Sequence, residues 1–121
     1  MSAPRSASPK GLGASGRKLW RSVLSDWELD EHEMALLREL CRITDRLDGL
    51  HAVVERDGEI VDGLHGPKVN PALTEARQQV IAAARITAAL RLPDGEDGGE
   101  SQGRRQRRVG ARGVYRLRGV S

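Results

Sequence analysis

Apolar residues recur at helical spacing in three segments of the chain, expected at about residues 15–27, 31–54 and 71–92. In the two longer segments the apolar positions are alternately three and four residues apart, which is the spacing of a heptad seam. The apolar face of the first segment consists of Leu19, Trp20, Val23, Leu24 and Trp27. The seam of the second consists of Leu36, Leu40, Ile43, Leu47, Leu50 and Val54, and that of the third of Leu73, Ala76, Val80, Ala83, Thr87 and Leu90.

Residues with helix-capping behaviour mark where the two longer helices begin. Asp30 is followed three residues later by Glu33, which is the pattern of a capping box. Asn70 and Pro71 predict an N-cap and a first helical position. At a rise of ~1.5 Å per residue, both helices would span on the order of 35 Å. The sequence therefore predicts an all-α fold in which a short N-terminal helix accompanies a long antiparallel helical hairpin.

The connector between the long helices, residues 55–70, carries a turn signal at Asp57-Gly58. Val53-Val54 before this turn and Ile60-Val61 after it are able to pair as a small β-hairpin. An unpaired connector of this length is uncommon inside a compact domain. The sequence leaves both the hairpin and the irregular connector open.

Composition points to a small protein that associates with itself. The 121 residues are 2% aromatic and include no Phe, so few large side chains are present to fill a core. Domains of this size often gain stability by oligomerising. The expected organisation is a flexible basic arm at residues 1–12, one helical domain at residues 13–93, and a Gly-rich linker with an arginine-rich tail at residues 94–121.

Charge is distributed unevenly along the chain. The first 25 residues hold five basic residues and no acidic one, and residues 101–121 hold seven arginines and no acidic residue. Such ends suit a phosphate backbone or an acidic protein partner. The candidate DNA-binding residues are Arg5, Lys10, Arg17, Lys18, Arg21, Arg104, Arg105, Arg107 and Arg108. The candidate residues for docking on a partner protein are Val114, Tyr115 and Leu117.

Patterns typical of catalysis or cofactor binding have simpler interpretations here. Residues 11–16 match GxGxxG, but no strand leads into them. We therefore expect a flexible segment that leads into the first helix, whose free N–H groups could meet a DNA phosphate. We expect Cys41 to be a packing residue, and Asp45 and Asp48 to be solvated charges. No catalytic residue, metal ligand or cofactor is predicted, and the chain is not expected to be an enzyme.

The N-terminus lacks the apolar stretch of a signal peptide, and no run of residues is long and apolar enough for a membrane span. The lone cysteine is compatible with a reducing compartment. We therefore expect a protein of the cytoplasm that does not associate with membranes.

The order of these features resembles the small subunits of bacteriophage terminases. The resemblance is carried by GLGASGRKLW at residues 11–20, LDEHEMALLRELCRITDRLD at 29–48, the Asp57-Gly58 connector, VNPALTEAR at 69–77 and LRLP at 90–93. It implies a homo-oligomeric ring in the host bacterial cytoplasm that binds double-stranded viral DNA. It also implies a partner, the terminase large subunit, which carries the ATPase and nuclease. In such proteins a helical hairpin builds the ring, and the two seams are the matching positions.

Two other functions remain open from the residues alone. The first two helices could form a helix-turn-helix in a dimeric DNA-binding regulator, although Asp30, Glu31 and Glu33 would repel phosphates at the start of the second helix. Alternatively, the chain could be a coiled-coil adaptor that binds no nucleic acid. The mass of the native assembly and DNA binding across a range of salt concentrations separate these functions.

Overall fold

The computed structural model describes residues 7–92 and 106–107, and this part of the chain is mostly helical. Its helices are α2 (Ala14–Asp26), α3 (Glu31–Asp57) and α4 (Pro71–Leu90). Its strands are β1 (Trp27–Glu28), β2 (Ile60–Gly63), β3 (Gly66–Val69) and β4 (Gln106–Arg107). The helical class predicted from the sequence is confirmed.

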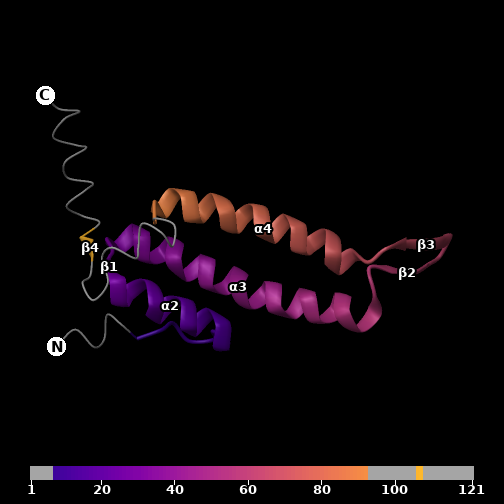
Figure 1. The fold of residues 1–121 in the computed structure, drawn as a ribbon, viewed down its shortest axis with the longest axis horizontal. Coiled ribbons are helices and arrows are strands. Elements are labelled where there is room, and N and C mark those ends of the chain that lie inside the picture. Colours follow the sequence, from indigo (N-terminus) through magenta and orange to yellow (C-terminus); the bar gives the residue numbers. More distant parts are fainter. Residues whose placement is uncertain (1–6, 93–105, 108–121) are drawn as a thin grey trace, which may run out of the picture.

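The longest helix, α3, lies between the other two (Figure 1). Along one side α4 runs in the opposite direction, and along the other side α2 covers the N-terminal half of α3. Partway along the two long helices, the Arg46 guanidinium donates a hydrogen bond of 3.0 Å to the side-chain oxygen of Gln79. At the far end, β2 and β3 form a hairpin that extends beyond the helices (Figure 1).

The predicted helix starts are present. The Asp30 N–H donates to the Glu33 carboxylate over 2.8 Å, and the Asp30 side chain accepts from the Glu33 backbone, which confirms the capping box. Asn70 is the N-cap of α4, and its side-chain oxygen accepts from the Ala72 N–H over 2.9 Å. Local sequence therefore determines where both long helices begin.

The hydrophobic core lies at one end of the molecule, where α2, the N-terminal half of α3 and the last turn of α4 meet. Leu37, Cys41 and Leu90 are fully buried there, and Trp20 is 3% exposed. Beyond Asp45, the other half of α3 packs mainly against α4, and its seam residues Leu47 and Leu50 are half-buried. One end of the helical body is thus packed more completely than the other.

Two seam positions predicted in α4 do not face α3. Val80 is 51% exposed and Thr87 is also exposed, while Gln79 and Ile86 are partly buried in their places. Gln79 and Ile86 are still seven residues apart, and together with Ala76, Ala83 and Leu90 they keep the alternating spacing of three and four residues. The repeat is therefore as predicted, but the side of α4 that faces α3 includes the residue before Val80 and the residue before Thr87.

The predicted pairing of Val53-Val54 with Ile60-Val61 is wrong, because both valines belong to α3. The antiparallel hairpin instead pairs Ile60 with Val69 and Gly63 with Gly66, around a turn at residues 64–65. Gly58 has a φ of 93°, and its N–H donates to the Val54 carbonyl, so the Asp57-Gly58 signal ends a helix instead of closing a hairpin. For this reason α3 continues to Asp57, three residues past its expected end.

Two residues of the C-terminal region belong to the described structure. Gln106 and Arg107 form β4, which pairs in parallel with Trp27 and Glu28 of β1. The remainder of the linker and tail, residues 93–105 and 108–121, lies outside the described residues. Among the described helices, none combines the length and apolarity needed to cross a membrane.

Candidate nucleic-acid interface

The exposed side of α2 carries three cations, Arg17, Lys18 and Arg21, which we call the basic face. Arg17 and Arg21 lie about one turn apart, Lys18 directly follows Arg17, and the exposed Ser22 extends the same side. The opposite side of α2 is buried against α3 through Trp20, Val23 and Leu24. Because α2 is fixed by this buried side, the basic face is presented on a rigid support.

The side chains of the three cations differ in the contacts that they already make within the protein. The Arg17 guanidinium donates to the Leu12 carbonyl over 2.5 Å and so helps to hold the segment that leads into α2. Within the part of the chain that the structure describes, Lys18 and Arg21 make no ion pair. Lys10 is exposed just before the helix. Lys18 and Arg21 are therefore the strongest candidates for a phosphate contact.

The N-terminus of α2 is occupied by a side chain of the protein itself. The two oxygens of the Asp45 carboxylate accept hydrogen bonds from the Gly13 N–H over 2.6 Å and from the Gly16 N–H over 2.7 Å. A carboxylate at this position also interacts favourably with the helix dipole. The expectation that these N–H groups are free for a DNA phosphate is thus wrong, as is the expectation that Asp45 is an ordinary solvated charge.

The glycines of the GxGxxG pattern permit this contact. A Cβ atom on Gly16 would lie 2.4 Å from Asp45 Oδ2 and 2.9 Å from the Cys41 carbonyl oxygen. A Cβ on Gly13 would lie 3.1 Å from Asp45 Oδ1, and Gly11 has a φ of 89°. The pattern therefore reflects the close approach of α2 to α3 and a turn before α2, with no need for a nucleotide.

Cys41 is fully buried beneath α2. Burial, together with the negative charge of Asp45, raises the pKa of its thiol from the ordinary value of 9.0 to about 11. The thiol is therefore protonated at neutral pH, which agrees with the predicted packing role. In the described segments, no group of three or more His, Cys, Asp or Glu residues is placed to hold a metal ion.

The residues predicted for self-association are distributed over the interface of α3 and α4. Those that are buried in one copy are Leu40, Ile43, Ala76 and Leu90. Those that are half-buried are Leu36, Leu47, Leu50, Val54, Leu73 and Ala83, and those that are exposed are Val80 and Thr87. Most of the predicted seams are thus used, fully or in part, inside a single copy.

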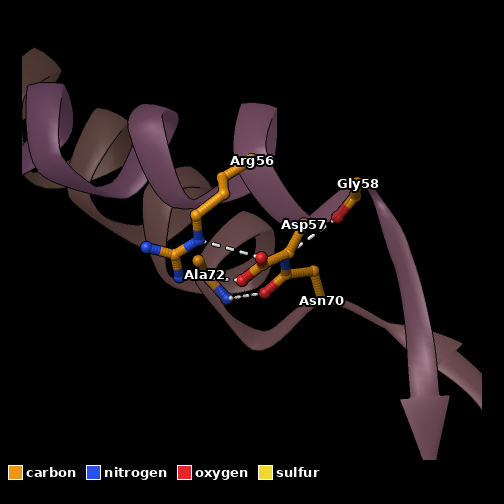
Figure 2. A network of polar contacts seen from close by, with 5 residues as sticks. All are labelled: Arg56, Asp57, Gly58, Asn70 and Ala72. Atoms are coloured by element: carbon orange, nitrogen blue, oxygen red, sulfur yellow. Dashed lines mark hydrogen bonds and ion pairs between the residues drawn. The ribbon is translucent and has the colours of Figure 1, made fainter.

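A network of polar contacts fixes the base of the hairpin (Figure 2). The Asn70 amide nitrogen donates to the Gly58 carbonyl over 2.9 Å, while the amide oxygen of the same side chain caps α4. Asn70 is 4% exposed, and its backbone N–H also donates to the Glu59 carbonyl. One side chain thus joins the end of α3 to the start of α4. The sequence predicted its cap but not its second bond.

Several predicted site residues cannot be placed. Arg107 is described through the backbone of β4 only. The following candidates lie outside the described residues: Arg5, Arg104, Arg105, Arg108, Val114, Tyr115 and Leu117. The structure therefore gathers Arg17, Lys18 and Arg21 on one helix, with Lys10 close by in the sequence.

Comparison of the chain with models of protein families, with curated proteins and with solved structures found no match.

Proposed function

We propose that the chain is the small subunit of a phage terminase, a non-catalytic homo-oligomer that binds double-stranded viral DNA. In this role it regulates or recruits the large subunit, the ATPase and nuclease, during genome packaging in the host cytoplasm. The observation that carries the proposal is the basic face of α2, whose Lys18 and Arg21 are exposed and make no ion pair within the described residues. The resemblance of the sequence motifs to this family supplies the biological context.

The arrangement favours contact with the DNA backbone over reading of base edges. Lysine and arginine side chains on one helix face suit phosphates, which carry no sequence information of their own. The first turn of α3 presents Glu31 to solvent, and its acidic character disfavours insertion of that helix into a groove. The proposed mode is therefore electrostatic and strongly dependent on salt.

Exposed apolar side chains support the oligomeric part of the proposal. Leu64 is 94% exposed, Ile60 is 60% exposed and Ile81 is 45% exposed. Contiguous exposed apolar surface often marks an interaction site. The antiparallel α3–α4 pair, on this proposal, is the unit from which the assembly is built.

The DNA-binding test compares two double variants that lose the same charge. Lys18→Ala with Arg21→Ala removes the two unpaired cations, whereas Arg42→Ala with Arg56→Ala removes two that pair with Glu39 and Asp57. We expect the first variant to lower affinity for duplex DNA and to reduce the slope of log K against log salt by about 2, because each phosphate contact contributes ~0.9. Fluorescence anisotropy across salt concentrations measures both, and the control variant should keep the wild-type slope.

The mass of the native assembly tests the rest of the proposal. An assembly of several identical subunits agrees with a terminase small subunit, and a strict dimer that binds DNA would instead indicate a helix-turn-helix regulator. Absence of duplex DNA binding at ~50 mM salt, where phosphate contacts are strong, would point to an adaptor without nucleic acid. Equal DNA binding by the two double variants would refute the assignment of the basic face.

A further inference from the structure

One face of the β2–β3 hairpin is apolar and exposed. In an antiparallel pair, directly opposite residues point to the same side, so the pairs Ile60–Val69 and Asp62–Pro67 share one face. All four residues are exposed, with Ile60 at 60% and Val69 at 46%. We call these four residues the hairpin face. It carries a single charge, the carboxylate of Asp62.

The second exposed apolar surface lies on α4. Val80, Ile81, Ala84 and Ala88 follow one another at helical spacing, and all are exposed. We call these four residues the α4 stripe. Arg77 lies one turn before Ile81 and Arg85 one turn after it, and neither makes an ion pair within the described residues. The α4 stripe is therefore apolar along its length with two unpaired cations beside it.

A single copy cannot bring these two surfaces together. The hairpin extends away from the start of α4, in the direction opposite to the α4 stripe (Figure 1). Its base is held by Asn70, which bonds to the Gly58 carbonyl and to the Ala72 N–H (Figure 2). Folding the hairpin back over its own helix would break the bond to Gly58, so both surfaces stay open in one copy.

We propose that the hairpin face of one copy packs on the α4 stripe of a second copy. The hairpin face fits within the length of the α4 stripe, because Ile60 and Asp62 are ~7 Å apart along the strand and the helix rise from Val80 to Ala88 is ~12 Å. The two surfaces match in chemistry, because Ala84 and Ala88 permit close approach of an apolar face. They match in charge, because Asp62 meets the side that carries Arg77 and Arg85.

This contact deepens the self-association on which the proposed function rests. Each copy presents both surfaces, so the contact is heterologous, and a chain of such contacts closes into a ring when the rotation between copies allows it. Pro67 lacks an N–H group, which disfavours the alternative in which β3 edges pair with one another. The hairpin is thus assigned as a connecting arm between neighbouring subunits.

The first test uses the mass of the full-length native protein. Ile60→Asp and Ile81→Asp each place a charge in the contact, and we expect self-association to weaken by roughly tenfold or more. Ala52→Asp, at an exposed position on α3 outside both surfaces, is the matched control and should assemble as the wild type does. Circular dichroism and thermal unfolding show that all three variants are folded. Normal assembly of folded Ile81→Asp, or a monomeric wild type, would overturn the proposal.

Charge reversal distinguishes a lost contact from a folding defect, because a folding defect would not be repaired by reversing the charges on both surfaces. Asp62→Arg alone, or Arg77→Asp with Arg85→Asp, should weaken assembly because like charges then face each other. The combination of all three substitutions should restore it. A triple variant that assembles more weakly than either parent would exclude the assigned pairing of charges.

Cross-linking identifies which surfaces touch. Chains with Ile60→Cys and chains with Ala84→Cys should form a disulfide-linked pair when mixed and oxidised, and neither should do so alone, while the buried Cys41 stays unreactive. A cross-link within the Ile60→Cys sample alone would show hairpin-to-hairpin contact and overturn the proposal.

DNA binding by the same samples separates this contact from the proposed function. If the samples cross-link but do not bind DNA, the contact between copies is supported and the packaging function is refuted. If the protein binds DNA but Ile81→Asp assembles normally, the packaging function is supported and this contact is refuted.

Discussion

At Gly16 the two helices α2 and α3 approach so closely that a methyl group has no room. Gly16→Ala would force its Cβ against the Asp45 carboxylate and the Cys41 carbonyl oxygen. We expect a loss of about 1–3 kcal/mol in the free energy of unfolding, typical of overpacking. Gly49→Ala is the control, because a Cβ there meets nothing within 4 Å and the helix gains roughly 0.5–1 kcal/mol. Urea unfolding measures both, and a neutral or stabilising Gly16→Ala would contradict the close approach.

Cys41 should make stability depend on alkaline pH. Its pKa is about 11 in the folded chain, against 9.0 for the ordinary thiol, so the unfolded chain loses the proton first. Stability from the protonated thiol is complete below pH 9 and is lost as pH rises toward 11. Between pH 8 and pH 10 this loss amounts to about 1 kcal/mol.

Comparison with Cys41→Ala isolates this effect, because every other titrating group is common to both proteins. The substitution itself lowers stability by a constant amount through the cavity that it leaves. Chemical unfolding at several pH values should therefore give two curves that converge above pH 9. Parallel curves across the whole range would show that the thiol is not buried as described.

Single residues also show where sequence reasoning reaches its limit. The bond between Asp30 and Glu33 was predictable because both partners lie within one helical turn. The bond between Asp45 and Gly16 spans 29 positions, and an aspartate among arginines on a helix has no local signal that distinguishes a cap from a solvated charge. The glycine spacing before α2 was the one available sign of close approach, and it was interpreted as a flexible segment.

At the scale of elements, the three helices of the described residues and their approximate bounds could be predicted from hydrophobic spacing and caps. Two predictions at this scale were wrong: the side of α4 that faces α3, and the interpretation of Asp57-Gly58 as a hairpin turn. The sequence pattern placed Val80 toward α3, whereas in the structure Val80 is exposed and the partly buried Gln79 accepts a hydrogen bond from Arg46. An Asp-Gly pair is common both in hairpin turns and after helices, and only the packing of α3 on α4 decides between the two.

Asn70 links the end of α3 to the start of α4, so its removal should have more effect than the loss of an ordinary cap. Asn70→Ala removes the acceptor for the Ala72 N–H and leaves the partly buried Gly58 carbonyl without its donor. We expect a cost of about 2 kcal/mol, the sum of a lost cap and a partly buried carbonyl without a hydrogen bond. Asn70→Asp keeps the cap and should cost less. Thr74→Ala, at an exposed position of α4, should change stability by less than ~0.5 kcal/mol.

Hydrogen exchange provides a second measurement for the same variants. Because Asn70 fixes the base of the hairpin, exchange of the β2 and β3 amides should accelerate in Asn70→Ala more than exchange in the centre of α3. Uniform acceleration across the whole chain would instead show that Asn70 stabilises only the global fold.

The two candidate surfaces lie at opposite ends of the helical body. The core and the basic face of α2 lie at one end, and the exposed hairpin lies at the other (Figure 1). The cations of the candidate site were predictable from charge alone, because basic residues without acidic neighbours stand out in the first 25 positions. The hairpin face could not be predicted from the sequence, since it depends on a strand register that the sequence left open. Surfaces built by pairing of strands require the fold before they can be identified.

The arginine-rich tail provides a test of the electrostatic proposal at this scale. Deleting residues 108–121 removes four arginines and keeps β4. If all four contact phosphates, the slope of log K against log salt becomes shallower by about 3–4, and affinity at moderate salt falls by roughly tenfold or more. Assembly should be unchanged, because both surfaces proposed for contact between copies lie elsewhere. Replacing the same four arginines by Gln, with the tail length kept, separates charge from chain length. An unchanged slope in both variants would exclude phosphate contacts by the tail, because phosphate contacts cannot be lost without a change in counterion release.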